Sequence, residues 1–439
     1  MQQYEVTGAR ASDIAASVEA AIGDGLLKAG ALLPTVRDLA AELGVNPNTA
    51  ASAYRLLRDR GTIETQGRQG SRVRNRPATS PAGRSLILPP GTINLVDGEP
   101  DPRLLPVLTP RLPTGPHGYG EPVLEPELRR EAVRLLENEG VDADHLACVF
   151  GALDGIERVL TTRLRPGDAV AVEDPGWTHL LDLLAAQNLR PVPVRVDDEG
   201  PIPADLDDAL RGGAKAFVTT TRAQNPYGSM TTGERAGELR AVLAAYPRVL
   251  TVDDDHGADL SPGPARTLAG ATAYWAYLRS ASKAYDPDLR IALLAGDART
   301  VDLVEGRLRH TARHVSRIIQ VTWADAIADP GVGLVVRRAA EAYDERRGAL
   351  IGALAEHGIE AHGRTGMNVW VPVADESAAL SALLSAGYAA APGVWFRQRS
   401  APGLRVTVAS LDPAQAGVVA AAIAAGRSAE SAHDRAGAV

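Results

Sequence analysis

The sequence lacks the features on which secreted and membrane proteins depend. Its single cysteine, Cys148, excludes a disulfide within the chain. No apolar run approaches the roughly 20 residues that span a bilayer, and the first ten residues lack the apolar stretch of a secretory signal. We therefore expect a cytoplasmic protein that does not enter a membrane.

A net positive charge is also absent. The chain carries 54 acidic and 46 basic side chains among its 439 residues, which gives a formal net charge of -8. A protein that coats nucleic acid along its whole length requires clustered Lys and Arg, so the composition excludes this class of nucleic-acid-binding protein. A local basic patch is nevertheless present, because the segment from Arg55 to Arg76 holds seven arginines against only Asp59 and Glu64.

Two amphipathic helices are expected near the N-terminus. Residues 11–28 place an apolar side chain at every fourth position, with Leu26 as the last member of the buried stripe. A second helix is predicted over residues 35–43, because Thr35 is a suitable N-cap and Gly44 a suitable C-terminal stop.

A third helix and a hairpin follow. The helix begins after the turn at residues 45–47, with Asn48 as its expected cap, and two short strand-like pieces occupy residues 62–65 and 71–74. Three helices with a tight turn between the last two, followed by a hairpin, make a winged helix-turn-helix, whose third helix enters the DNA major groove.

A chain of this length is too long for one typical domain. The composition shifts to Pro, Ser, Gly and Ala after the hairpin, so we predict a DNA-binding domain over 1–76 and a linker over 77–93. From residue 94 to about 300, apolar strand-like runs alternate with helical stretches, which indicates an α/β domain with a mostly parallel sheet. Residues from about 340 to 430 are expected to form a smaller α+β subdomain, so that the second domain spans 94–430.

The N-terminal stretch resembles the winged helix of the GntR family. The motifs LPTVR at 33–37 and NTAASAYRLL at 48–57, and the wing at 67–73, each stand where that family places them. Alternatively, the arginines form a solvated helical face without a ligand. The resemblance implies that DNA is contacted by Arg37 at the second helix, by Asn48, Thr49 and Arg55 on the third, and by Arg68 and Gly70 in the wing.

A constellation suited to an aldehyde cofactor stands further along the chain. Such chemistry needs a lysine that forms a Schiff base and donors that bind a phosphate. Lys283 ends the motif SASK after a strand-like run, and Arg290 follows seven positions later. Ser280, Ser282 and Arg290 are expected to form a phosphate cup with the helix N-terminus at Gly151-Ala152-Leu153, whose free amides favour an anion.

Three further side chains complete the constellation. Asp254 ends a strand-like run and is expected to hold a protonated pyridine nitrogen, Asn225 to donate to the phenolate oxygen, and Trp177 to stack on the ring. Taken singly, each has another explanation: an Asp at a strand end is often a structural cap, and a Trp is usually part of a core.

These elements, together with GYGEPVLEPELR around Tyr119, resemble fold-type I aminotransferases. The resemblance implies pyridoxal 5'-phosphate as the cofactor, with Tyr119 at its site, and Arg405 as the clamp for an effector carboxylate, although an ion pair explains Arg405 equally well. His256 stands where the family usually carries a tyrosine that donates to the phenolate oxygen. The sequence also departs from the family at three other positions, Ala292, Thr221 and Ala223.

The fusion of these two domains resembles the MocR branch of the GntR family. It implies a homodimer, usually swapped head to tail, that binds double-stranded operator DNA and senses PLP, an amine or an amino acid through a Schiff base at Lys283, with at most weak transaminase half-reaction activity. One alternative is a working aminotransferase with a vestigial DNA-binding domain. Another is a regulator whose large domain has lost its cofactor and serves only for dimerisation. The fold expected is a winged helix-turn-helix plus an α/β PLP-dependent transferase of fold type I, and no metal site is expected.

Overall fold

The structure is a computed structural model of the chain. It describes residues 6–23, 26–28, 30–59, 62–65, 70–73, 86–114, 118, 120–261, 263 and 265–436. Arg68 and Tyr119, both predicted to bind ligands, lie outside these ranges, and so do residues 74–85 of the basic segment and linker. Within the described ranges, no helix is long and apolar enough to cross a membrane.

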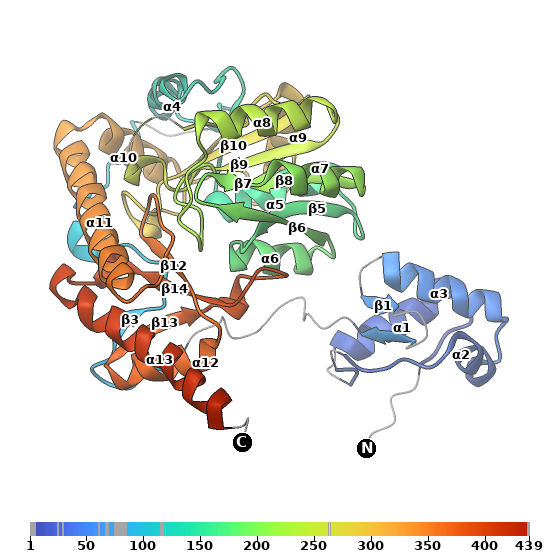
Figure 1. The fold of residues 1–439 in the computed structure, drawn as a ribbon. Coiled ribbons are helices and arrows are strands. Elements are labelled where there is room, and N and C mark those ends of the chain that lie inside the picture. The colour runs from blue at the N-terminus through green and yellow to red at the C-terminus, as the bar shows by residue number, and fades with distance from the viewer. Residues whose placement is uncertain are drawn as a thin grey trace. The chain divides into compact units, whose positions relative to one another are not determined.

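The N-terminal part is a three-helix unit with a two-stranded wing (Figure 1, blue). Its core gathers Ile14 from the first helix, Leu39 from the second and Leu57 from the third, each with no exposed surface. The apolar stripes therefore meet one another as the periodicity predicts, and the winged helix-turn-helix is confirmed. Its elements are α1 (Ala11–Gly23), α2 (Val36–Leu43), α3 (Pro47–Asp59), β1 (Ile63–Thr65) and β2 (Ser71–Val73).

Helix α2 begins and ends where the sequence predicts. The Thr35 side chain accepts a hydrogen bond from the backbone N–H of Asp38, which satisfies one of the amides left open at a helix start. At the other end Gly44 takes a left-handed φ of 63°, a conformation that glycine adopts without steric cost.

Two details of the neighbouring helices differ from expectation. Helix α1 ends at Gly23, so Leu26 follows the helix and is 52% exposed instead of buried. Helix α3 begins at Pro47, and the side-chain oxygen of Asn46 accepts from the backbone N–H of Asn48 at 2.9 Å. Proline is favoured at the first helical position because its ring already sets the helical φ. The cap is therefore Asn46, and Asn48 lies inside the helix.

The second part of the chain contains an eight-stranded sheet in the order β4-β11-β10-β9-β8-β5-β6-β7. Strands β8, β9 and β10 run parallel, whereas β11 runs antiparallel to its neighbours β10 and β4. The predicted α/β domain is confirmed, with a mixed sheet. The strands are β4 (Leu146–Val149), β5 (Ala169–Asp174), β6 (Arg190–Asp197), β7 (Gly200–Pro201), β8 (Ala214–Thr219), β9 (Leu250–Asp254), β10 (Tyr274–Ser280) and β11 (Ala292–Gly296).

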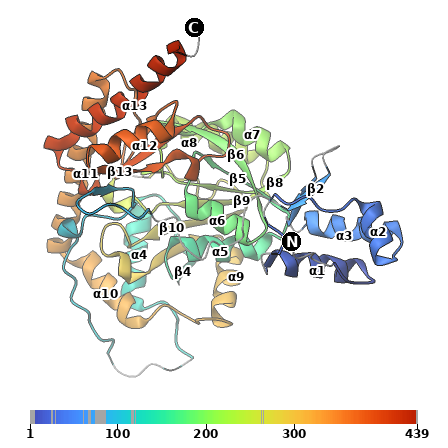
Figure 2. The same ribbon diagram turned by 90° about the horizontal axis from the view of Figure 1, so that it is seen from below.

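Helices surround this sheet and lead to the C-terminal subdomain (Figures 1 and 2). Helices α5 and α9 pack against each other and against β10, and α11, which has 27 residues, packs against both α10 and α13. The helices are α4 (Pro126–Asn138), α5 (Ala152–Arg163), α6 (Thr178–Ala186), α7 (Pro203–Arg211), α8 (Gly233–Ala244), α9 (Ala298–Arg309), α10 (Arg317–Ala328), α11 (Pro330–Glu356), α12 (Glu376–Ser385) and α13 (Ala416–Ala436).

The C-terminal subdomain has a four-stranded sheet in the order β12-β14-β13-β3. Strands β12 (Asn368–Pro372), β13 (Tyr388–Pro392) and β14 (Gly403–Thr407) come from the predicted α+β region, and α12 and α13 lie side by side next to them (Figure 2). The fourth strand, β3 (Ile93–Leu95), comes from the border of the predicted linker and runs parallel to β13. Its three residues carry too little periodicity to predict a strand.

Candidate cofactor site and nucleic-acid interface

The predicted cofactor residues gather where neighbouring parallel strands end. Asp254 is the last residue of β9, Ser280 is the last residue of β10, and Asn225 lies in the loop after β8. These three strands are adjacent, and the carboxyl ends of parallel strands meet at one edge of a sheet, which is where open α/β sheets bind ligands. Lys283 follows three residues after the end of β10.

The amine of Lys283 donates a hydrogen bond to the main-chain carbonyl of Gly98. Burial, and next the positive guanidinium of Arg405, lower the pKa of Lys283 to about 8. A lowered pKa gives a larger fraction of neutral amine near neutral pH, and the neutral form is the nucleophile. Lys283 therefore has the chemical character that covalent capture of an aldehyde requires.

Asp254 presents one carboxylate oxygen without a partner. Its Oδ2 lies 3.1 Å from Nδ1 of His256, whereas Oδ1 is buried and has no hydrogen-bond partner among the described residues. Burial opposes the charged form of His256, but the neighbouring Asp254 carboxylate outweighs it and raises the pKa of the imidazole above its ordinary value. His256 thus contacts Asp254 through Nδ1, and a contact of its other nitrogen with a cofactor oxygen remains a prediction.

Trp177 stands beside this pair. Its ring centroid lies 6.3 Å from that of His256, with the planes tilted by 36°. The turn that carries it is anchored by Asp174, whose carboxylate accepts from the backbone N–H groups of Gln398, Arg399 and Ser400. An aromatic surface is therefore fixed close to the Asp254–His256 pair.

The helix N-terminus predicted to bind a phosphate lies next to the predicted arginine. Gly151 has a φ of +95° and precedes the first turn of α5, and a Cβ added there would approach Nη2 of Arg290 to 3.2 Å. A side chain at Gly151 would therefore press against the guanidinium, and its absence lets Arg290 lie beside the start of α5, where the amides of Ala152 and Leu153 favour an anion. Ser280 Oγ accepts from the backbone N–H of Ser282 at 3.2 Å.

Arg405 lies in a fully buried environment that lowers its pKa to about 10. Its Nη1 donates to the side-chain oxygen of Asn225 at 3.1 Å, its Nη2 donates to the carbonyl of Val96, and its Nε is buried without a partner among the described residues. The guanidinium also lies 4.7 Å from the ring centroid of Phe396. Arg405 thus binds the oxygen of the Asn225 side chain and not its nitrogen.

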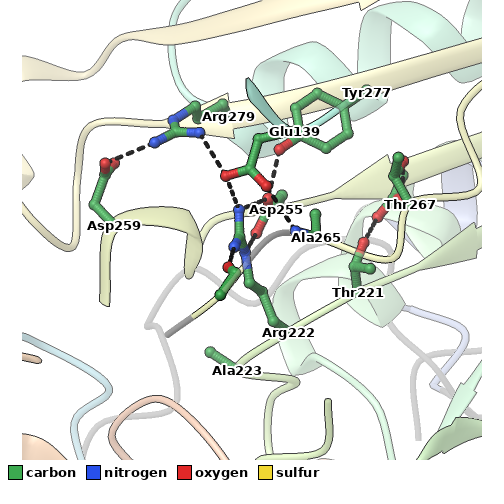
Figure 3. A network of polar contacts seen from close by, with 12 residues as sticks. Glu139, Thr221, Arg222, Ala223, Asp255, Asp259, Ala265, Thr267, Tyr277 and Arg279 are labelled. Carbon is green, nitrogen blue, oxygen red and sulfur yellow. Dashed lines mark hydrogen bonds and ion pairs between the residues drawn. The ribbon is translucent and has the colours of Figure 1, made fainter. Parts of the chain in front are cut away.

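Two groups of residues at this site were not predicted from the sequence. Val96 and Gly98 act through main-chain carbonyls, for which a sequence pattern gives no signal. A buried ion network that includes Arg222 and Asp255 lies next to the same strand ends (Figure 3). Charged residues directly beside apolar strand-like runs are the sequence signal for this network, because ionised side chains are rarely buried unless they are paired.

The candidate DNA interface lies on the winged helix. Arg37, Asn48 and Arg55 are exposed, and Thr49 is half-buried. The hydroxyl of Tyr54 in α3 donates to the carbonyl of Pro34 at 2.7 Å, which ties the third helix to the start of the second.

The wing is a short antiparallel pair. Ile63 of β1 is paired with Val73 of β2, and Leu32 forms a bridge to Arg72 on the other side. Gly70 has a φ of +86°, and a Cβ added there would lie 3.2 Å from the Leu32 side chain, so the backbone directly before β2 favours glycine at this position.

Both domains of the chain match known protein families. The model of the family Aminotransferase class I and II matches residues 98–423, and that of Bacterial regulatory proteins, gntR family, matches residues 10–73. The vitamin B6 salvage pathway transcriptional repressor PtsJ of Salmonella typhimurium is 37% identical over 95% of this chain and 98% of its own length. The probable rhizopine catabolism regulatory protein MocR of Rhizobium meliloti is 23% identical over 76% and 74%. The chain is a MocR-type regulator of the GntR family.

A solved structure supports the fold of the larger part of this MocR-type regulator. Kynurenine aminotransferase of Pyrococcus horikoshii matches it with a TM-score of 0.69 at 21% identity, over 77% of this chain and 91% of the enzyme. At that identity the likeness shows the fold alone, which is the predicted fold type I.

The residues of this MocR-type regulator fit pyridoxal phosphate, the cofactor that its family implies. Oδ1 of Asp254 is a buried acceptor that lacks a donor among the described residues, and Arg290 lies against Gly151 at the start of α5. When bound, the cofactor supplies an aldehyde that reacts with primary amines. Lys283 is the amine that would hold it, and Trp177 the aromatic surface beside its ring.

Proposed function

We propose that this MocR-type regulator is a PLP-dependent transcription regulator that senses PLP, or an amine or amino acid that reacts with it, at Lys283. The observation that carries the proposal is a lysine with a pKa lowered to about 8 at the same sheet edge as Asp254, whose Oδ1 is buried and has no donor in the described part of the chain. An unsatisfied buried acceptor costs free energy, so a cofactor that donates to it is stabilised there.

PLP itself is the first signal to test. The support comes from PtsJ, a repressor named for vitamin B6 salvage, which aligns with this chain over 98% of its length. The proposal includes a homodimer in the head-to-tail arrangement, double-stranded operator DNA as the partner, and the cytoplasm as the location.

The test is a fluorescence anisotropy titration against DNA from upstream of the protein's own gene, at fixed salt, with and without PLP. We expect PLP to change the dissociation constant of the wild-type protein, and Lys283→Ala to abolish both this response and the visible absorbance of the bound cofactor. The matched control is Lys215→Ala, because Lys215 is exposed and the chain has only one other lysine, Lys28. A PLP response that survives in Lys283→Ala contradicts the proposed role of Lys283. The absence of specific DNA binding contradicts the proposed function as a transcription regulator.

A second candidate function is transamination with turnover. The hydrogen bond between Arg405 and Asn225 favours it, because this pair presents a guanidinium suited to an α-carboxylate beside the cofactor residues. An enzyme releases keto acid over many cycles, whereas a sensor stops after reacting with one effector molecule. Measuring keto acid per PLP over several hours separates the two functions.

A further inference from the structure

The strand ends that carry the cofactor residues also carry members of the buried ion network (Figure 3). Asp255 follows Asp254 directly, and Arg222 precedes Asn225 by three positions. The network is therefore joined through the main chain to the residues proposed to bind the cofactor, although none of its side chains belongs to that set.

Arg222 and Asp255 form a two-point ion pair in the interior. The Arg222 side chain is 1% exposed and that of Asp255 is fully buried. Nε of Arg222 donates to Oδ1 of Asp255 at 2.8 Å, and Nη2 donates to Oδ2 at 2.7 Å. Arg222 also donates to Glu139 at 2.6 Å and to the carbonyl of Gly263 at 2.7 Å, while Tyr277 donates to Oδ2 of Asp255. Every oxygen and nitrogen of this pair is thus held in a fixed direction.

Asp255 follows directly after β9, and its carboxylate accepts from Tyr277, which is the register partner of Asp253. Asp253 and Asp255 therefore lie on one face of the sheet and Asp254 on the other, which agrees with the alternation of side chains along a strand. Asp253 shares a face with Asp255 and is likewise bonded on that side, to Thr221 and Thr267. Asp254 faces the other way, toward His256. The hydrogen bonds of Asp253 and Asp255 on one face of the sheet therefore fix the backbone that directs the Asp254 carboxylate to the other face.

The Asp255 main chain is fixed as well. Its N–H donates to the carbonyl of Leu278 on the neighbouring strand at 2.8 Å. With both the side chain and the amide of Asp255 held, the preceding peptide unit has little freedom to rotate. Arg222 also neutralises Asp255, which would otherwise be an unpaired charge next to Asp254.

We propose that Arg222 is a positioning residue for the cofactor site: through its two-point pair with Asp255 it holds the Asp254 carboxylate where the cofactor's ring nitrogen is bound. This inference rests on the proposed binding of PLP at Asp254. It gives the network a role in setting the protonation of the ring nitrogen, beyond its contribution to stability.

The test uses the full-length double variant Arg222→Met/Asp255→Asn. Removing both charges avoids leaving one of them unpaired in the interior, which is the main destabilising effect of breaking such a pair. Three quantities are measured: the PLP dissociation constant by absorbance titration, the pH midpoint of the visible absorbance of the PLP-bound protein, and the unfolding temperature of the apoprotein. We expect a folded protein whose dissociation constant rises about tenfold, by analogy with lost outer-shell partners of metal ligands, and whose pH midpoint shifts.

The matched control is Asp259→Asn. Asp259 belongs to the same network but bonds Arg279 and not Asp255, so we expect a lower unfolding temperature with an unchanged dissociation constant and pH midpoint. Wild-type values in the folded double variant, or equal shifts in the control, would overturn the inference and leave the network a purely structural role. If the double variant does not fold, Asp255→Asn alone is judged by the same criterion. A wild-type protein that shows no visible absorbance with PLP would instead overturn the proposed function, and the inference with it.

Discussion

Lys283 carries an amine whose pKa is lowered, chiefly by burial, from 10.5 to about 8. The protonated amine does not attack an aldehyde, so the rate of PLP capture follows the neutral fraction. We expect this rate to rise with pH through about 8 and to level off above it, as followed by stopped-flow absorbance. Free lysine, which levels off only near its own pKa of about 10.4, is the reference. A protein profile that coincides with that of the free amino acid would contradict the lowered pKa.

Asp254 is the residue whose charge matters most for the cofactor ring. Asp254→Asn keeps the shape and the buried position but removes the negative charge that favours a protonated ring nitrogen. Hydrogen bonds to charged groups contribute about 1.5–3 kcal/mol, so we expect the PLP dissociation constant to rise roughly ten- to a hundredfold. Absorbance titration measures it, with Asp253→Asn as a control on the opposite face of the same strand. A control that loses as much affinity would assign the effect to the strand as a whole.

Side-chain chemistry decided which single residues could be predicted. Lys283, Asp254 and Arg290 could be named as candidates because the chemistry of an aldehyde cofactor requires their residue types and the motifs give their order. Arg222 could not be, because its partner Asp255 lies 33 positions away and nothing in the local pattern connects them. The carbonyls of Val96 and Gly98 were equally hidden, since every residue carries the same acceptor.

Secondary-structure elements were predictable where a local signal marks both ends. Helix α2 has a capping threonine and a terminal glycine, and its bounds agree with the prediction. The predicted cap of helix α3, Asn48, was wrong, because the helix already begins at Pro47 and Asn46 caps it. Strand β3 could not be predicted because it is a strand only through its pairing with β13, about 295 residues later.

The cap of α2 gives a prediction for one element. Thr35→Ala removes the side-chain acceptor for the Asp38 N–H and should destabilise the winged helix by about 1 kcal/mol. Hydrogen exchange of the α2 amides in the full-length protein detects this as faster exchange in that helix. Thr35→Ser keeps the acceptor and should exchange like the wild type. Unchanged rates in the alanine variant would show that the cap contributes no stability.

DNA binding depends on the charge of the whole molecule as well as on single contacts. The contribution of Arg37 is therefore compared with that of an arginine outside the winged helix. Arg37→Ala should weaken operator binding by about 1–3 kcal/mol if the arginine forks onto a base. The control is Arg248→Ala, which removes the same charge from an exposed position outside the winged helix. Anisotropy titrations at one fixed salt concentration compare the two variants. Equal losses would indicate a general electrostatic effect rather than a contact of Arg37 with DNA.

The carbonyls of Val96 and Gly98 already accept hydrogen bonds from Arg405 and Lys283. A ligand that takes the same N–H groups of these cations would exchange bonds rather than add them, and such an exchange contributes little to affinity by itself. The two released carbonyls must then find water or other donors. They lie directly after β3, and the chain preceding that strand continues back to the winged helix. Such a ligand would change the hydrogen bonding of the segment that follows β3 in the chain.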